Sequence, residues 1–427
     1  MKIAVIGSGI SGLTAAHSMA GVHDIHVFES SSHPGGHAHT VTVLEGDREI
    51  PIDTGFIVFN EATYPGFSKL LNELKVSTNK TRMSFAVSCA AHDIEYSSLG
   101  LKGMLAHPRA MLAPSRTKMV LEILRFYREA NEILDCDTGN DESLGEYLSR
   151  KGYGKEFKRH FIVPLIGCIW STSPDAVSSY PARYLFAFLN NHGLLKPTGR
   201  HQWKTIRGGS RQYVERLVER LPNKVRVRTP VHSIARHADG VAVILQSGCT
   251  EQFDRVVLAT HSNQALQLLS RPTPLERQAL LDLRYKDSRV VLHTNRNVMP
   301  VRAKAWAAWN YTTASCLETP SPASVSYHMN KLQQLDAEQD YFISVNPHTE
   351  VAPEQIVAEF TYSHPQYDRA TQSAQIILRS ISGSNKVHFA GAYLGHGFHE
   401  DGFQSGLRVA CDLAKSQTLY SPVTVPA

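Results

Sequence analysis

The sequence predicts an α/β protein in which a Rossmann-type domain with a parallel sheet is interleaved with an α+β domain. Three observations predict this class. The chain has 427 residues, more than one ordinary domain of roughly 100 to 200 residues. It opens with a strand, a glycine turn, a helix and a second strand, within about 30 residues, the size of one βαβ unit. Short buried strand patterns return near residues 255 and 387, after long stretches of different character.

Hydrophobic periodicity divides the chain into the segments of two interleaved domains. We assign residues 1–75, 206–262 and 386–427 to the nucleotide-binding domain, and residues 76–205 and 263–385 to a substrate or cap domain. The first cap segment is mainly helical, with MVLEILRFYREANEIL as its clearest run. The second alternates helix-like and strand-like segments, which predicts a second sheet. Between them, VHSIARHADGVAVILQSG predicts two strands joined by a tight turn.

Composition excludes several classes of protein. With 42% hydrophobic and 19% charged residues, the chain is not typical of collagen, coiled coils or extended disorder. The formal net charge of +5 is too small and dispersed to indicate a nucleic-acid partner. The six cysteines include no C-x-x-C pair, which is typical of reduced thiols. No apolar run is long enough for a membrane-spanning helix, so we expect a cytoplasmic protein.

The segment GSGISG fits the G-x-G-x-x-G motif, between a predicted strand and a predicted helix. Gly7 allows a tight turn, Gly9 lets a pyrophosphate approach the backbone, and Gly12 lets the helix pack on the strand. The helix N-terminus attracts the phosphates without a lysine. Glu29, 17 residues after Gly12, is placed to accept hydrogen bonds from ribose hydroxyls. The alternative is that the three glycines make a purely structural turn and that Glu29 is a solvated residue at the end of a strand.

A second glycine pair, Gly35 and Gly36, follows in HPGGHAHT. The chain resembles flavoproteins of the amine oxidase and phytoene desaturase type, which have a G-G-R-x-x-T element at this distance from the acid. In that resemblance the element contacts the pyrophosphate of FAD, which implies FAD as the cofactor and an amine oxidase-like fold. His37 stands at the arginine position, and Thr40 keeps the threonine. Because an imidazole is mostly neutral at pH 7, phosphate binding must depend on backbone donors.

More specifically, the chain is similar to the N-terminal flavin part of plant cyclopropane fatty acid synthases and to bacterial stand-alone relatives of that part. The similarity covers nearly the entire chain and rests on GGHAHTVT, IDTGFIVFNEATYPGF, MSFAVS, CIWSTSP, NHGLL, WKTIRGGSRQYVERL, MPVRAKAWAAWNY and GHGFHEDG. It implies a hydrophobic or acyl-lipid substrate. Because no methyltransferase half is present, it also implies that any lipid methyltransferase partner is a separate polypeptide.

The resemblance implies further FAD contacts. Val231, at the start of the returning hairpin, matches the position whose backbone meets the adenine. Gly391 ends a strand beside the ribityl chain, where Ala392 replaces the acid of many relatives. Asp401 and Gly402 begin a helix whose N-terminus points at the flavin N1 and O2 edge and stabilises its negative charge. The remaining expected contacts are Ser11, Thr54 and Gly55.

The catalytic candidates are His399 and Glu400, next to that helix N-terminus. An unperturbed histidine pKa of about 6.5 suits a proton acceptor near neutrality, and a hydrogen-bonded structural histidine is the alternative for His399. An apolar tunnel fits an acyl chain, although most aromatic residues belong to the core. The aromatic candidates for lining such a tunnel are Trp170, Trp306, Trp309, Tyr311 and Phe186.

No metal site is expected, because the pairs His37/His39 and His396/His399 lack the three or four convergent ligands that zinc uses. A serine hydrolase is unsupported, because no G-x-S-x-G follows a strand. Residues 101–134 combine basic and apolar side chains. This run predicts either peripheral contact with an anionic inner membrane or a cap helix with a solvated basic face.

The sequence therefore predicts an FAD-dependent oxidoreductase. By resemblance, it oxidises or desaturates a hydrophobic, acyl-lipid-like substrate by hydride transfer to the flavin. An amine or carotenoid-type oxidase is the alternative among enzymes. A non-catalytic flavoprotein that partners a lipid methyltransferase is the alternative outside them.

Overall fold

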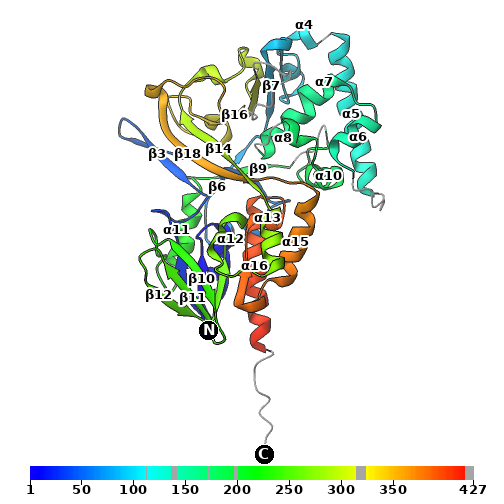
Figure 1. Cartoon of the computed structure of the whole chain (residues 1–427). Coiled ribbons are helices and arrows are strands. Elements are labelled where there is room, and N and C mark those ends of the chain that lie inside the picture. Colours follow the sequence, from blue (N-terminus) through cyan, green and yellow to red (C-terminus); the bar gives the residue numbers. More distant parts are fainter. Residues whose placement is uncertain (112, 136–141, 171–173, 197–200, 314–323, 419–427) are drawn as a thin grey trace, which may run out of the picture.

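The structure is a computed structural model, which describes residues 1–111, 113–135, 142–170, 174–196, 201–313 and 324–418. These residues form two halves, one above the other in Figure 1. The lower half contains a parallel sheet with the opening and closing helices, and the upper half contains a larger sheet beside a group of helices. Each half combines segments that lie far apart in the sequence, as the predicted fold class requires.

A four-stranded parallel sheet forms the centre of the lower half. Its strand order is β19-β13-β1-β2, and every neighbouring pair is parallel. Ile3 and Val5 of β1 pack in one core with helix α1, while Ala4 and Ile6 belong to a core on the opposite face. Burial on both faces explains why the strands are continuous apolar runs. The strands are β1 (Lys2–Ile6), β2 (Asp24–Phe28), β13 (Arg255–Leu258) and β19 (Val387–Phe389).

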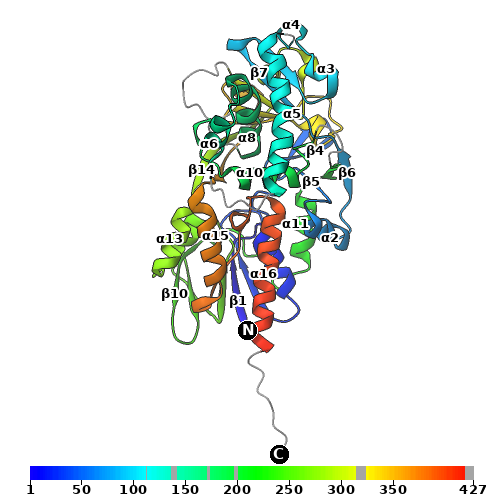
Figure 2. The same cartoon turned by 90° about the vertical axis from the view of Figure 1, so that its right-hand side faces the viewer.

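The first and last helices pack against each other over this sheet (Figure 2). Helix α1 spans Ile10–Met19 and helix α16 spans His399–Thr418. A Cβ on Gly406 would lie 2.2 Å from the carbonyl oxygen of Ser11, and one on Gly402 would lie 2.7 Å from Ile10 Cγ2. Glycine is therefore required for this close approach, which brings the two ends of the described chain to one site.

The predicted returning hairpin is present as β10 (Val231–Arg236) and β11 (Val241–Leu245), which pair antiparallel and continue into β12 (Thr250–Phe253). Helices α13 (Pro274–Asp282) and α15 (Arg369–Ile381) lie in the range assigned to the substrate domain, 263–385. Both helices share a hydrophobic core with the parallel sheet. Their apolar faces need a sheet face to cover, and the second face of the parallel sheet supplies it.

The upper half contains a seven-stranded mixed sheet of order β18-β14-β17-β16-β15-β7-β8. Only the β15–β7 pair is parallel among its described strands. Its strands are β7 (Phe85–Cys89), β8 (Ile94–Ser97), β14 (Tyr285–His293), β15 (Trp309–Thr313), β16 (Ser324–His328), β17 (Phe342–Val345) and β18 (Ile356–Pro365). Two smaller sheets are formed by β3 (Thr40–Glu45) with β4 (Arg48–Asp53), and by β5 (Val58–Asn60), β9 (Trp203–Ile206) and β6 (Thr78–Thr81).

The helices of the upper half pack around an aromatic core beside this sheet. The longest is α5 (Pro114–Asp135), which contains the predicted run from Met119. The helices with at least four residues elsewhere in the described chain are α2 (Pro65–Glu73), α3 (Gly100–Met104), α4 (Pro108–Met111), α6 (Leu144–Arg150), the π-helix η2 (Lys158–Ile162), α8 (Val163–Trp170), α9 (Pro174–Val177), α10 (Ala182–Asn191), α11 (Arg211–Glu219), α12 (Ser262–Leu268) and α14 (Met329–Leu332).

Several cations of the basic run 101–134 are paired within the protein. Arg116 is buried and forms an ion pair with Glu156. Arg125 lies 2.8 Å from Glu129 one turn along the same helix. These pairs are those of a cap helix packed on the core. Within the described ranges, every helix is too short or too polar to cross a bilayer.

Candidate cofactor and active site

A large cavity of about 1780 Å³ lies where the two halves meet, and residues of both halves line it. Gly7, Gly9, Glu29 and Val231 line it from the parallel-sheet half. Aromatic and aliphatic side chains line it from the other half. A pocket for one drug-sized ligand measures about 300 to 1,000 Å³, so this cavity has room for a dinucleotide and a substrate together.

The glycine-rich loop lines the cavity between β1 and α1. Gly7 has φ +101°, and a Cβ there would lie 2.7 Å from the carbonyl oxygen of Ala259. A Cβ on Gly12 would lie only 2.0 Å from the carbonyl oxygen of Gly7. Gly9 differs, because a Cβ there would meet no atom within 4 Å. Packing therefore requires the first and third glycines, whereas the second leaves open space beside the α1 N-terminus, as binding of a phosphate there would require.

The second glycine pair lies against this loop. The Gly35 amide donates to the carbonyl oxygen of Ser8 at 3.0 Å. Gly36 has φ +58°, and a Cβ there would lie 3.2 Å from Gly9 Cα. Both turns therefore line the same part of the cavity with backbone and no bulky side chain. No side chain caps the first turn of α1. Its amide groups are available to an anion.

Glu29 follows β2 and lines the cavity beside the loop. Its Oε2 accepts from the Ser8 amide at 3.0 Å and from Ser8 Oγ at 2.6 Å. Its Oε1 accepts from the Ser31 amide at 2.9 Å. Burial raises the pKa of this carboxyl, but the hydrogen bonds from Ser31 and Ser8 outweigh it, so the pKa lies below its ordinary value. Glu29 is thus an ionised acceptor fixed at the cavity wall, as hydrogen bonding to a ribose hydroxyl would require.

Histidines line the cavity beside the second glycine pair. The His37 ring lies 5.6 Å from the His261 ring, 4.9 Å from the Tyr362 ring and 6.3 Å from the His364 ring. Burial lowers the pKa of His37, and it lowers the pKa of His261 to about 4 and of His364 to about 3. All three are therefore neutral at pH 7.

His37 Nε2 is buried without a hydrogen-bond partner among the described residues. A buried polar atom of this kind needs a partner, and a cofactor phosphate or hydroxyl would supply one. The unpartnered nitrogen, the open space at Gly9 and the fixed carboxylate of Glu29 together fit a dinucleotide such as FAD. Backbone amides and His37 would hold its pyrophosphate, and Glu29 its ribose.

The loop after β4 supports this histidine group. A Cβ on Gly55 would lie 2.3 Å from the His37 carbonyl oxygen, so glycine is needed there. Thr54 Oγ1 lies 2.6 Å from Tyr362 Oη and 3.2 Å from His39 Nδ1. Both Thr54 and Gly55 line the cavity.

Three further expected FAD contacts also lie on the cavity wall, namely Ser11, Val231 and Gly391. The Gly391 amide donates to Ser405 Oγ at 2.9 Å, and a Cβ on Gly391 would lie 2.2 Å from the Tyr393 ring. Ala392, where many relatives have an acid, lines the cavity as well. Most of the residues expected near one cofactor, from the first glycine turn to Gly391, thus line one cavity although they lie far apart in the sequence, whereas Asp401 and Gly402 do not line it.

His399 begins α16 and faces the cavity. Its ring stacks on Phe56 at 3.7 Å, and a 2.8 Å hydrogen bond joins its Nε2 to Tyr213 Oη. Burial, with the neighbouring His37, lowers the pKa of His399 to about 3. The neutral ring holds a proton weakly near pH 7, so this environment favours the structural alternative over a proton acceptor.

The next three residues of α16 contact neighbouring parts of the protein and not the cavity. Glu400 accepts from the amides of Gly66 and Phe67, at 3.0 and 2.9 Å, and so caps α2. Asp401 accepts from the Phe398 amide at 2.9 Å, and burial raises the pKa of its carboxyl to about 6. Gly402 packs on α1. None of the three is among the described residues that line the cavity, so the catalytic role expected of Glu400 has no geometric support.

The upper half gives the cavity an apolar end. Trp170 and Trp309, two of the aromatic candidates, line it. Phe186 and Tyr311 lie in the helical core instead, and Trp306 packs under Arg296 and Lys331. The apolar residues that line this end include Phe85, Leu165, Ile169, Trp170, Phe188, Leu194, Trp309, Tyr327 and Phe398, and polar residues such as His192 and Gln202 lie among them.

Cavity-lining residues of β18 and α12 were not expected from the sequence. Residues 360–365 of β18, among them Phe360, Tyr362 and His364, line the cavity, and His261 lines it just before α12. The strand was visible in the sequence as EFTYSHP, but only the fold shows which cavity it lines.

Solved structures of similar fold include three with stated activities. A CLA-producing fatty acid isomerase from P. acnes has a TM-score of 0.69 and 16% identity, over 97% of this chain and 98% of its own. Cyclohexylamine oxidase from Brevibacterium oxydans has a TM-score of 0.70 and 16% identity, over 98% and 99%. Putrescine oxidase bound to putrescine has a TM-score of 0.68 and 15% identity, over 97% and 99%. At these identities, the likeness shows the fold alone.

No curated protein matches the sequence. The family described as flavin containing amine oxidoreductase matches residues 10–313, well over half of the chain. That range includes the second glycine pair, the histidines His37 and His261, and the aromatic wall at Trp170 and Trp309. The chain therefore belongs to the flavin-containing amine oxidoreductase family and is an FAD-dependent oxidoreductase with an amine oxidase-like fold.

Proposed function

We propose that this flavoprotein oxidises or desaturates a hydrophobic, acyl-lipid-like substrate whose chain occupies the apolar end of the cavity. FAD, when bound, would supply a two-electron acceptor for a hydride from one substrate carbon, and the proton released from the neighbouring carbon would pass to a cavity-lining histidine or to solvent. The protein supplies the apolar wall that orients the chain and excludes water. The resemblance of the sequence to the flavin part of plant cyclopropane fatty acid synthases supports the same substrate class.

The charge of the cavity wall carries this proposal. Among the described residues that line the cavity, Glu29 is the only carboxylate, and Ser8 and Ser31 hold it at the ribose end. A cationic amine at the apolar end would find no carboxylate to pair with. Burying an unpaired ammonium group costs several kcal/mol or more, whereas an alkyl chain gains by burial. The lining therefore favours an acyl chain over an amine.

The two non-histidine cations of the described lining are Lys80 and Arg82, both exposed and both on or just after β6. Their charge suits an anionic head group, such as a carboxylate or a phosphate, that stays in water while its chain enters the cavity. An acid or a phospholipid fits this arrangement better than a hydrocarbon such as a carotenoid, which has no head group to place there.

The aromatic wall has fixed geometry. Trp170 Nε1 donates to the carbonyl oxygen of His396 at 3.1 Å, and its ring lies 4.5 Å from the Phe188 ring. Phe188 and Phe398 stack at 4.8 Å. Because these rings pack on one another, they form a rigid wall that would hold a flexible chain against the flavin.

Peripheral membrane contact is part of the same proposal. Leu101, Leu121 and Leu124 are exposed, with 75%, 63% and 50% of their surface accessible, and they lie near the exposed cations Lys102 and Lys118 in sequence. An anionic bilayer would present lipid to such a surface. Retention in the supernatant after pelleting with anionic liposomes at low salt would contradict this contact.

Anaerobic titration of the purified flavoprotein tests the substrate class. Free fatty acids and phospholipids are expected to bleach the absorbance of oxidised flavin, and primary amines and diamines to leave it unchanged. Bleaching by amines alone would overturn the proposal in favour of an amine oxidase. Bleaching by no compound, together with a co-purifying lipid methyltransferase, would support the non-catalytic alternative.

A further inference from the structure

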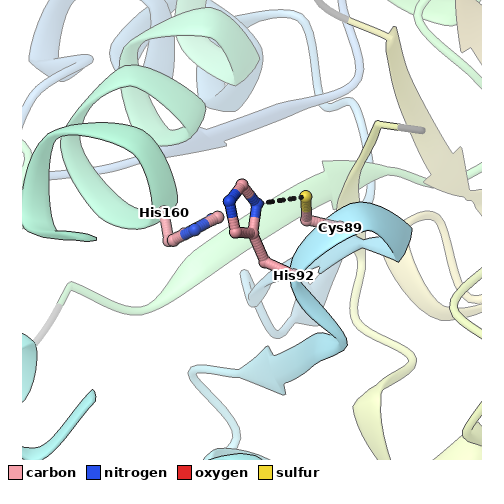
Figure 3. A group of neighbouring side chains, drawn as sticks. All are labelled: Cys89, His92 and His160. Carbon is pink, nitrogen blue, oxygen red and sulfur yellow. Dashed lines mark hydrogen bonds between the residues drawn. The ribbon is translucent and has the colours of Figure 1, made fainter. Parts of the chain in front are cut away.

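We propose that Cys89, His92 and His160 form a binding site for a zinc ion, remote from the flavin cavity. One ligand atom of each residue lies within 4.8 Å of the other two (Figure 3). From the sequence we expected no metal site, at the pairs His37/His39 and His396/His399 or elsewhere. These three residues meet only in the fold, because His160 lies 68 positions after His92 along the chain.

The spacing of the donor atoms is close to that around zinc. Cys89 Sγ lies 3.3 Å from His92 Nδ1. Two ligands of a tetrahedral zinc ion are about 3.5 Å apart, given bond lengths of about 2.0 to 2.3 Å. The His92 and His160 rings meet edge to face, with centroids 4.9 Å apart and an interplanar angle of 72°. The side chains of His92 and His160 lie beside each other next to Cys89 in Figure 3, so the three donors need to approach by only about 1 Å to surround one ion.

Local structure places each donor. Cys89 ends β7, and the turn η1 (Ala90–His92) carries His92 back over it in a C-x-x-H spacing. Asp93 closes this turn with φ 46°. His160 belongs to the π-helix η2, whose backbone is held by Tyr96 Oη donating to the His160 carbonyl oxygen at 2.5 Å. Isolated π-helical turns occur frequently at functional sites.

The donor chemistry selects the ion. A thiolate with two imidazoles suits zinc, whereas magnesium and calcium prefer oxygen ligands. Glu156 Oε2 lies 3.5 Å from His160 Nε2, and Arg116 pairs with that carboxylate. A carboxylate beside a ligand histidine orients the ring in many metal sites. A water molecule would complete the tetrahedron, with Glu156 as the carboxylate beside His160.

The surroundings give the ion a structural role. Cys89 and His160 are 1% and 0% exposed, and none of the three donors is among the described residues that line the flavin cavity. The site joins the edge of the seven-stranded sheet to η2, which continues into α8. Cys168, Ile169 and Trp170 of α8 line the cavity. An ion here would therefore fix the cavity wall without taking part in the flavin chemistry.

Metal titration of the flavin-loaded protein tests the site. After chelation and removal of the chelator, calorimetry is expected to show one zinc ion bound per chain, and the melting temperature to rise with zinc concentration. Cobalt in place of zinc should give the ligand-field absorption of a tetrahedral site at wavelengths longer than those of oxidised flavin. Absence of stoichiometric binding, or of this tetrahedral absorption, would overturn the proposal.

Variants assign the donors. Loss of a second-shell partner already weakens metal sites by about 10- to 100-fold, so Cys89→Ser and His160→Gln should each lower zinc affinity by at least that factor. Cys411→Ser, at an exposed cysteine, is the matched control and should bind as the wild type does. Unchanged affinity in Cys89→Ser would contradict the site. If that variant misfolds and loses its flavin, X-ray absorption spectroscopy of the zinc-loaded wild type tests the site instead. A zinc coordination shell without sulfur would contradict the proposed site.

Discussion

The two ends of the cavity are built by different means. At the dinucleotide end, backbone turns around Gly7, Gly9 and Gly36 leave room for a ligand, and an added Cβ meets backbone or fills that room. At the apolar end, side chains of α8, α10 and β15 form the wall, with Trp170, Phe188 and Trp309 as its rings. The first end specifies one cofactor closely. The second specifies only a shape and a polarity.

Substitutions should therefore separate the two ends. Changes at the dinucleotide end are expected to alter FAD binding, whereas changes at the apolar end should alter the substrate and leave FAD in place. If changes at the apolar end instead weakened FAD binding, and changes at the dinucleotide end altered the substrate, the cofactor and the substrate would occupy the opposite ends of the cavity.

The largest effect is expected from Gly9→Val. The new side chain projects into open space and does not disturb the fold, but it occupies the place of a phosphate. Loss of one charge-assisted hydrogen bond costs up to about 3 kcal/mol, which corresponds to about 100-fold weaker FAD binding. Calorimetric titration of the Gly9→Val apoprotein with FAD measures this loss of affinity.

Gly21→Val is the matched control, because a Cβ on Gly21 also meets no atom within 4 Å but Gly21 does not line the cavity. Equal FAD affinity in both variants would contradict the placement of the pyrophosphate at Gly9. Both apoproteins should melt close to the wild-type temperature.

The second effect concerns pH. Burial holds the pKa of His37 below 6.5 without ligand, so its ring is neutral at pH 7. The negative charge of a bound pyrophosphate favours the imidazolium form and raises that pKa, so the bound state takes up protons. By linkage, FAD affinity rises as the pH falls, by up to about tenfold per pH unit for one proton.

Dissociation constants for FAD measured between pH 8 and pH 6 check this dependence, and His37→Gln should flatten it. Calorimetry in buffers of different ionisation enthalpy counts the protons taken up. An affinity independent of pH in the wild type would place the pyrophosphate away from the histidine group.

A comparable effect on the substrate is expected from Trp309→Ala. Trp309 lines the apolar end, and removal of one aromatic contact there should raise KM for an acyl substrate by about tenfold, equivalent to about 1.4 kcal/mol. FAD affinity should stay within about twofold. Steady-state kinetics, normalised to the flavin content of each preparation, measure KM. Calorimetric titration of the apoprotein measures FAD affinity.

Trp306→Ala provides the contrast, since Trp306 lies three residues away and outside the cavity lining. Its KM should equal that of the wild type. A raised KM in Trp306→Ala, with an unchanged KM in Trp309→Ala, would contradict binding of the acyl chain at Trp309.

The smallest effect is expected from Lys80→Gln and Arg82→Gln. Both residues are exposed, and an exposed ion pair contributes about 0.2 to 1 kcal/mol, so KM for an anionic lipid should rise by about two- to fivefold. KM for a neutral ester of the same chain should not change. Lys69→Gln, at another exposed lysine, is the control. Equal changes for acid and ester would contradict head-group binding at β6.

Much of the dinucleotide end was predictable from the sequence, because its constraints are local. The spacing of Gly7, Gly9 and Gly12 and the acid at Glu29 follow from one βαβ unit, and a resemblance extended the prediction to Gly36 and His37. The hairpin at residues 231–245 and the helix from Met119 were likewise visible as periodic patterns.

The sequence by itself determined the fold class, the family resemblance and the residues of the phosphate-binding turns, since each depends on neighbours within a few positions. Only the tertiary structure decided that Glu400 caps α2, that α13 and α15 cover the parallel sheet, and that Cys89 and His160 meet. The direction of a side chain and its distant neighbours depend on how the elements pack. Periodicity gives the face of a helix or a strand, but packing decides what that face contacts.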